Sequence, residues 1–415
     1  MQFELSNSDR KYLGLDSANE DWKIIFINND LVYYIDENSF IRKISYIFEY
    51  DDFDNKFRFD EFDTYYKIEN NFILSISEKK KNKPLTKDNL YALKPTGLRF
   101  IWDGYVSIEN NVNNTYFYDS RIENIELNSF DELRKWIEDF KNLTTEDDLK
   151  ELDTFKKEKN KRIISKEGDF FAFKLDRRSY GFGRIILNLF EIYKKDKKFF
   201  DNKQNLGLSY FNAPVLVKIY LYDNVKLNID LDYLKSCKSF PSFVITDYHL
   251  LKGQYKIIGN KKIEEHEYDF PIDVGLFSTE LNYPYNTESF FQWGLIFKTN
   301  KSILWYKNSL LSKVKLFTNG TFNIVQSIIN LELYTKCKLE NNIDFFWDEY
   351  NVSMSEISKN EEVFTMNNNL FIDLRSPFYV KEKETLFQLF NIDINKTYYE
   401  NYVEFLNTKN NNLFQ

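Results

Sequence analysis

The sequence has few of the residues that disulfide frameworks, metal knuckles and fibrous chains require. Its 415 residues include two cysteines, two histidines, 12 glycines and seven prolines. So little glycine and proline excludes collagen-like and elastic-linker chains. Cys237 and Cys337 lie too far apart for a metal knuckle. They could form one disulfide, but a sparse cysteine count more often means reduced thiols in a cytosol.

Long apolar runs and an excess of positive charge are also lacking. No stretch approaches the roughly 18 uncharged apolar residues of a transmembrane helix. The opening MQFELSNSDRKYLG has no basic region followed by an apolar one, so no secretory signal is expected. The net charge of −8 disfavours nucleic-acid binding, because holding phosphates needs surplus lysine and arginine. We expect a cytoplasmic protein without membrane association, whose acidic surface favours basic partners.

Aromatic and apolar residues are plentiful. Phenylalanine and tyrosine number 40 and 29, and 43% of the residues are hydrophobic, which excludes a largely disordered chain. A chain of this length predicts two or three domains. We expect an N-terminal domain over 1–160, a central domain over 161–300 and a C-terminal extension over 301–415.

The first part of the chain predicts an antiparallel meander. Short β-branched and aromatic runs at 22–27, 31–35 and 41–47 are separated by Asn- and Asp-rich turns, and strands at 72–76 and 98–108 continue the pattern. The periodicity then changes. Ser129 and Glu132 form the pattern of a capping box, and apolar residues follow at helical spacing: Leu133, Trp136, Ile137 and Phe140. A second helix starts at Thr144 or Thr145, so a helical pair is predicted near 129–160.

Strands are predicted again from Ser165 onward. The expected strands are 169–175, 181–189, 215–221, 243–245, 255–258 and 290–298, with a short helix at 231–237 and further elements at 322–333 and 385–390. The fold class is therefore α+β and mostly antiparallel sheet. The central module is expected to be a strongly bent sheet or partial barrel, because glycines in the strand at 181–189 permit a bend.

The histidines are the first candidates for chemistry. His249 follows Asp247, and His266 lies among Glu264, Glu265 and Glu267. Two histidines with added carboxylates could serve one mononuclear metal site, but the spacing matches no known ligand motif. The favoured interpretation is a loop imidazole in an acidic, solvated patch.

Other catalytic patterns are no stronger. Gly181-Phe-Gly183-Arg184 lacks the G-x-G-x-x-G form of a phosphate loop and continues as a strand, so its glycines are interpreted as structural. Arg184 is expected to pair with Asp169 or another carboxylate. No G-x-S-x-G sequence exists, and neither cysteine has a neighbouring histidine. We therefore assign no catalytic residue, no cofactor and no metal.

The strongest signal for a partner lies at 49–63, where seven acidic and two basic residues are interleaved with five aromatics. An acidic, aromatic surface suits a basic protein partner. The alternative is an amphipathic hairpin whose phenylalanines belong to the core and whose charges face water. This alternative is favoured, because runs of charged residues usually form a solvated face and nothing more. On the first interpretation the partner-binding residues are Asp51, Asp52, Asp54, Asp60, Glu61 and Asp63.

The central region resembles a known family. Gly168-Asp-Phe-Phe-Ala-Phe-Lys-Leu, followed by Tyr180-Gly-Phe-Gly-Arg-Ile-Ile, is similar to the opening of the bacterial immunity protein 26 family, which also carries a joint name with a phosphotriesterase, HocA. Segments at 214–220, 254–271 and 292–296 follow in the expected order, so the resemblance covers about 165–298. Tyr255 replaces the usual tryptophan, and residues 10–15 look like the opening of whole-length relatives. The matching motif positions are interpreted as structural: Gly168, Asp169, Gly181, Gly183, Arg184, Gly259, Trp293 and Gly294.

The resemblance implies a bacterial immunity protein of a polymorphic-toxin or interbacterial competition system. Such a protein binds a cognate protein toxin, such as a nuclease, and neutralises it without catalysis. Two alternatives stay open, a metal-dependent phosphotriester hydrolase and a general protein-binding module. The scarcity of histidine counts against the hydrolase.

Overall fold

The computed structural model describes most of the chain. The described residues are 3–27, 30–50, 56–75, 81–188, 214–270, 272–278, 287–300, 374–375 and 380–412. The chain forms two compact units. The first comprises residues 1–163 with 175–178 and 251–254, and the second comprises 164–174, 179–250 and 255–415. Both contain helices and antiparallel sheet, which confirms the predicted α+β class.

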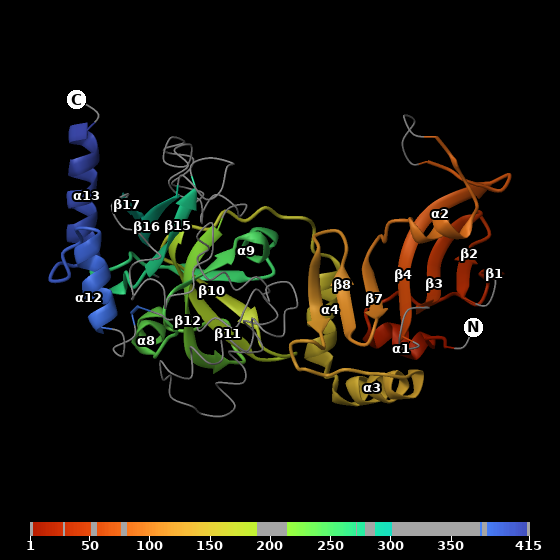
Figure 1. Ribbon diagram of the computed structural model, residues 1–415. Helices are drawn as coiled ribbons and strands as arrows, with labels where there is room; N and C mark the ends of the chain where they lie inside the picture. The colour runs from red at the N-terminus through yellow and green to blue at the C-terminus, as the bar shows by residue number, and fades with distance from the viewer. Residues whose placement is uncertain are drawn as a thin grey trace. The chain divides into compact units, whose positions relative to one another are not determined.

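The first unit contains a nine-stranded sheet built largely as a meander (Figure 1). Its path runs β1-β2-β3-β4-β7-β8-β9, with β5 on β4 and β6 on β5, and every pair is antiparallel. The strands are β1 (Lys23–Ile27), β2 (Leu31–Ile35), β3 (Phe40–Tyr50), β4 (Lys56–Glu69), β5 (Phe72–Ile73), β6 (Lys83–Pro84), β7 (Leu98–Trp102), β8 (Val106–Asn110) and β9 (Thr115–Asp119).

The described helices of this unit are α1 (Asn7–Tyr12), α2 (Lys87–Tyr91), α3 (Phe130–Leu143) and α4 (Glu146–Lys156). The predicted helical pair is present as α3 and α4. The hydroxyl of Ser129 caps α3 by accepting from the Glu132 amide, but the Glu132 carboxylate accepts from the Asn128 amide, so the predicted reciprocal box is not closed. A complete capping box instead begins α4 at Thr145 and Asp148.

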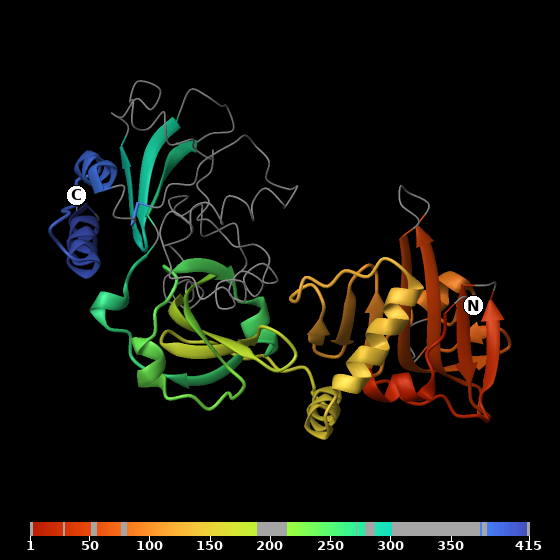
Figure 2. The same cartoon turned by 90° about the horizontal axis from the view of Figure 1, so that it is seen from below.

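The helical pair and the segments on either side of α1, with Leu5 and Leu13, contribute to the larger core of this unit. Leu133, Ile137 and Phe140 of α3 are buried in one cluster with strand residues that include Phe59 and Phe100. Figure 2 shows α3 and α4, in yellow, beside the sheet. A second cluster contains residues of β2, β3 and β4 together with Leu90 of α2.

The second unit contains an open five-stranded sheet in the order β13-β12-β11-β10-β14. The strands are β10 (Asp169–Lys174), β11 (Tyr180–Asn188), β12 (Pro214–Asn224), β13 (Phe243–Thr246) and β14 (Lys256–Asn260). All the pairs are antiparallel, and register shifts interrupt β10–β14 once and β11–β12 twice. One shift falls at Gly181/Phe182, where a bend was predicted. Among the described strands, β13 and β14 are the two ends of this sheet, so these strands do not close into a barrel.

Short helices flank this sheet: α8 (Leu231–Ser236), α9 (Tyr248–Lys252) and the 3-10 helix η1 (Glu265–Glu267). The prediction of a helix at 231–237 is confirmed. The prediction of one strand at 290–298 is wrong, because the chain there forms a hairpin of β16 (Thr287–Trp293) and β17 (Ile296–Asn300). Gly294 has φ +54°, a left-handed conformation that glycine adopts readily in a two-residue hairpin turn.

A three-stranded sheet, β15-β16-β17, completes the second unit together with two C-terminal helices (Figure 1). β15 spans Ile272–Ser278, and the helices are α12 (Val380–Leu389) and α13 (Tyr398–Asn412). Phe291 and Ile296 are buried in one cluster with Phe387 and Phe405. The described part of the C-terminal extension therefore helps to form the core of this unit. The expected elements at 322–333 lie outside the described residues, and the division at 160 and 300 stays a prediction.

Candidate functional site

The described residues of the acidic stretch singled out from the sequence lie in the paired strands β3 and β4 of the first unit. Asp51, Asp52 and Asp54 lie outside the described residues. Asp60, Glu61 and Asp63 lie in β4, and their exposed fractions are 0%, 0% and 4%. Both interpretations of these three carboxylates are therefore corrected, because the carboxylates are buried in this chain and do not lie on the surface that either interpretation requires. The buried Phe59 and Phe62 agree with the hairpin whose phenylalanines are core.

Glu61 is held by charges from two elements. The Arg10 guanidinium of α1 donates to its two carboxylate oxygens at 2.6 and 3.2 Å, and the Ser45 hydroxyl of β3 donates at 2.7 Å. The Lys43 ammonium lies 3.5 Å away. Burial alone raises the pKa of Glu61, but the Lys43 and Arg10 charges and the hydrogen bonds outweigh burial and lower the pKa. Glu61 is thus an ionised, internally paired group.

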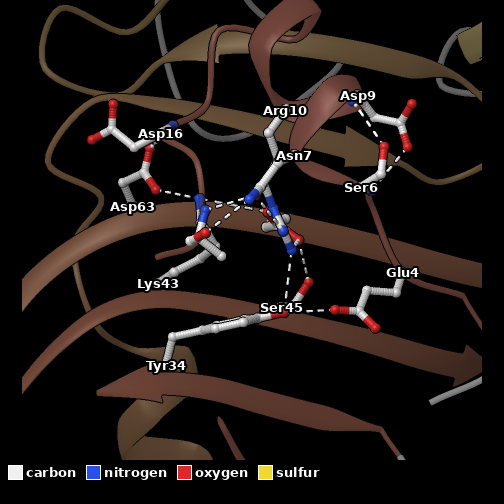
Figure 3. Close-up of polar contacts among 12 residues, drawn as sticks. Glu4, Ser6, Asn7, Asp9, Arg10, Asp16, Tyr34, Lys43, Ser45 and Asp63 are labelled. Carbon is white, nitrogen blue, oxygen red and sulfur yellow. Dashed lines mark hydrogen bonds and ion pairs between the residues drawn. The ribbon is translucent and has the colours of Figure 1, made fainter. Parts of the chain in front are cut away.

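Lys43 and Asp63 extend this network across the sheet (Figure 3). The two residues are directly paired in the register of β3 and β4, and their side chains form an ion pair. The backbone amide of Asp16 donates to the Asp63 carboxylate at 2.8 Å. Burial raises the pKa of Asp63, and the Lys43 charge and the Asp16 amide only partly oppose it. The network therefore fastens both α1 and the loop that follows it to the centre of the sheet.

Asp60 lies next to Glu61 in the strand and so points to the other face of the sheet. There it accepts a hydrogen bond from the Tyr46 hydroxyl at 2.5 Å and pairs with Arg99, whose Nε is 2.8 Å from Oδ1. Arg58 also approaches it, at 3.3 Å. This part of the stretch consequently carries paired internal charge on both faces of β4.

These cationic partners were not predicted from the sequence. Arg10 and Glu61 are 51 positions apart, so nothing local relates them. The pairing of Lys43 with Asp63 had a weak signal in the sequence. The two residues are the same number of positions from the centre of the β3–β4 hairpin, which places them opposite each other in its register. Opposite charges at directly paired strand positions are expected to attract.

The first motif positions of the second unit form a turn before β10. Gly168 has φ +83°, and a β-carbon there would collide with the backbone oxygen of Lys261. The Gly168 amide donates to the Ile185 oxygen at 2.8 Å, and its oxygen accepts from the Lys261 amide. Asp169 is buried and accepts from the Lys166 amide and the Asn260 side chain. Both residues hold β10 against its neighbours.

Arg184 is the fully buried centre of the same sheet. Its guanidinium pairs with Glu267 of η1 and donates to the backbone oxygens of Lys261 and Lys262 at 2.8 and 2.9 Å. It also lies over the Phe170 ring, 4.6 Å from the centroid. The carboxylate it pairs with is thus not Asp169, and 83 positions separate Arg184 from Glu267.

The remaining motif positions are packing positions. Gly181 and Gly183 lie in β11, and a β-carbon on Gly183 would collide with Phe171. A β-carbon on Gly259 of β14 would approach Leu231 of α8 to 2.6 Å. The Trp293 ring contacts those of Phe387 and Tyr398, and Gly294 adjoins Phe270 and Tyr398. Gly183, Gly259, Trp293 and Gly294 thus pack against other side chains of the second unit, and Gly181 is buried in β11.

The two histidines have different surroundings. His266 is largely exposed, with its Nδ1 3.5 Å from a Glu264 oxygen, which agrees with an imidazole in an acidic, solvated patch, but it lies in the 3-10 helix η1 and not in a loop. His249 does not fit that interpretation, because it lies in α9 between the rings of Tyr248 and Tyr255. Burial lowers the pKa of His249 to about 4. Among the described residues, no three His, Cys, Asp or Glu side chains come together as a metal-binding group.

Comparison with known proteins identifies the central segment. Residues 166–279 match the family model of Immunity protein 26. This confirms the family of the resemblance and supports an immunity-protein role, but the segment at 292–296, with Trp293 and Gly294, lies outside the match. The match begins at the Gly168 turn and includes the whole five-stranded sheet with Arg184 and Glu267. No curated protein and no solved structure matches the chain. None of the described helices is both long and apolar enough to cross a membrane.

Proposed function

We propose that this chain is a bacterial immunity protein that neutralises a cognate protein toxin by binding it, without catalysis of its own. The observation that carries the proposal is the family match over residues 166–279. The toxin belongs to a polymorphic-toxin or interbacterial competition system, and a nuclease is one class that fits an acidic inhibitor. Neutralisation takes place in the cytoplasm, and it requires neither a cofactor nor contact with nucleic acid or membrane.

The structural role of the motif residues in the matched segment supports a binding function. Its motif residues are used for packing and for buried hydrogen bonds, as the pairing of Arg184 with Glu267 illustrates. Such residues make a rigid sheet whose outward side chains are free to differ between relatives that meet different partners. A stoichiometric inhibitor needs this combination of a fixed scaffold and an adaptable surface.

Co-expression with the product of the adjacent gene tests the proposal. We expect restored growth of cells that express the toxin, and recovery of both chains as one complex with fixed stoichiometry. A toxin variant without activity should still bind, because neutralisation depends on contact. A toxic neighbour with neither rescue nor complex would contradict the proposal. Stoichiometric metal in the purified protein, with turnover of a chromogenic phosphotriester, would favour the hydrolase alternative instead.

Asp51, Asp52 and Asp54 remain proposed contacts of the partner. Their exchange for lysine should weaken binding and reduce its dependence on salt, because attraction between opposite charges raises the association rate. Affinity and salt dependence that both stay unchanged would exclude the three residues from the interface.

A further inference from the structure

Strand β1 forms one end of the nine-stranded sheet in the first unit. It pairs with β2 on one side, and no other described strand pairs with its outer side (Figure 1). The outward N–H and C=O groups of an edge strand can pair with a strand of another chain. Strand addition of this kind is a recurring mode of peptide recognition.

The side chains of β1 leave this edge unprotected. Ile25 and Ile27 pack partly against the cluster beneath β2 and β3, whereas Ile24 and Phe26 are 47% and 59% exposed. Natural edge strands usually carry proline, bulges or inward-pointing charges that prevent pairing with another chain. The sequence of β1 is KIIFI, its register with β2 is uninterrupted, and Lys23 at its start is its one charged residue.

Carboxylates gather at the beginning of this strand. Glu20 and Asp21 are exposed and precede it, separated from Lys23 by Trp22. The exposed Glu37 lies in the turn between β2 and β3, which reaches the same end because Lys23 pairs with Ile35. Lys23 and Arg42 bring positive charge to this end, but Arg42 pairs with Asp36 and lies over the Trp22 ring. These two cations are outnumbered by the carboxylates of Glu20, Asp21, Asp36 and Glu37. The edge therefore combines an apolar face with an excess of negative charge at one end.

We propose that β1 is the docking edge for the toxin, which adds an extended segment to the sheet as a further strand. This inference rests on the proposed function. Alternate apolar residues of the added segment pack on Ile24 and Phe26, and lysine or arginine at its end meets Glu20, Asp21 and Glu37. A second copy of this chain is a poorer occupant, because it brings the same carboxylates and the same net charge of −8.

The test compares the full chain with the double variant Ile24→Lys, Phe26→Lys in binding to the purified toxin. We expect at least about 30-fold weaker binding, the change that the loss of a hot-spot side chain worth about 2 kcal/mol produces. Leu143→Lys is the matched control, since Leu143 belongs to the same unit, is 67% exposed and lies at the end of α3. This control should bind like the parent protein.

Three further measurements distinguish loss of the β1 contact from unfolding of the variant and from a change in electrostatic attraction. Circular dichroism should show that the double variant is folded, because both changed side chains are exposed. Amide hydrogen exchange at 23–27 should slow in the complex of the parent protein. Triple reversal of Glu20, Asp21 and Glu37 to lysine should lower the association rate and its salt dependence.

Unchanged affinity of the folded double variant would overturn the inference while leaving the proposed function intact. A parent protein that forms no complex with a proven toxin would overturn the proposed function and the inference with it. A dimer of the parent protein that the double variant abolishes would assign the edge to a second copy, which also contradicts the proposal.

Discussion

Replacing Glu61 by glutamine tests whether buried charge holds α1 against the sheet of the first unit. Glutamine keeps the size of the side chain but removes the negative charge that faces Arg10 and Lys43. Both cations are themselves buried, with side-chain exposures of 4% and 0%. The substitution therefore leaves positive charge in the interior with only Asp63 to balance it.

The expected cost follows from that imbalance. Removing one partner of a buried ion pair costs about 3–5 kcal/mol, because the remaining charge stays desolvated without compensation. For a unit of this size each kcal/mol lowers the melting temperature by roughly 2–4 °C, so the transition of the first unit should fall by roughly 6–20 °C. Calorimetry of the full chain measures this shift, and amide exchange in α1 should accelerate at the same time.

The pH dependence of the unfolding free energy is a second, independent test of the role of Glu61. The pKa of Glu61 is lower in the folded protein than its ordinary value of 4.5. Its ionised form is therefore favoured by folding, and that stabilisation is fully present above about pH 4.5. It is lost as the pH falls through the lowered pKa. The difference in stability between the parent protein and Glu61→Gln should accordingly be constant near neutral pH and shrink in acid.

The control is Asp147→Asn, because Asp147 pairs with Lys150 on the exposed surface of α4. Exposed pairs contribute about 0–1 kcal/mol, so this variant should melt close to the parent protein. The reasoning would be refuted if Glu61→Gln were as stable as Asp147→Asn, or if its cost were the same at pH 3 and pH 7. Either result would mean that the network stabilises the fold no more than surface charges do.

Two further predictions concern Gly168 and His249 of the second unit, and Gly104 of the first unit serves as the control for Gly168. Gly168→Ala should destabilise by about 3 kcal/mol or more, since a left-handed conformation costs alanine about 1–2 kcal/mol and the collision with the Lys261 oxygen adds to it. Gly104 also has a left-handed conformation, with φ +90°, but a β-carbon there would meet no atom nearer than 3.9 Å. Gly104→Ala should therefore lose only the conformational part, about 1–2 kcal/mol. The pKa of His249 is lowered from 6.5 to about 4, so its neutral form is favoured by folding and the chain should lose up to about 3 kcal/mol as the pH falls across that interval. His249→Gln should remove this loss and the exposed His266→Gln should not, which thermal melts at pH 4, 5, 6 and 7 can decide.

Local patterns predicted most of the secondary structure because their causes are local. The helical spacing of Leu133, Ile137 and Phe140 gave the buried face of α3. The turn signals placed the strands at 22–27, 31–35 and 41–47 close to their observed bounds, but the single strand predicted at 98–108 is wrong, because the chain there forms the two paired strands β7 and β8. The prediction of one strand at 290–298 was wrong because the apolar residues continue through the hairpin turn at Gly294, so the run has no polar turn signal.

The placement of charge could not be predicted in the same way. An acidic residue in an alternating run is normally assigned to the solvent face, and Glu61 and Asp63 contradict that rule only because Arg10 and Lys43 are also buried. The pairing of Arg184 with Glu267 likewise depends on elements brought together by the fold. Such ion pairs belong to tertiary structure, so composition and periodicity do not reveal them.

This burial of acidic residues changes where negative charge can act on a partner. Carboxylates that are neutralised inside the sheet contribute little to the field that a toxin meets, whereas the exposed carboxylates Glu20, Asp21 and Glu37 contribute to that field and are screened by salt. If β1 is the docking edge, the two parts of that edge should affect binding kinetics differently. The carboxylates should govern how fast the complex forms and the apolar pair Ile24 and Phe26 how slowly it dissociates, because steering acts before contact and packing acts after it. Charge reversal that changes only dissociation would contradict this assignment of roles.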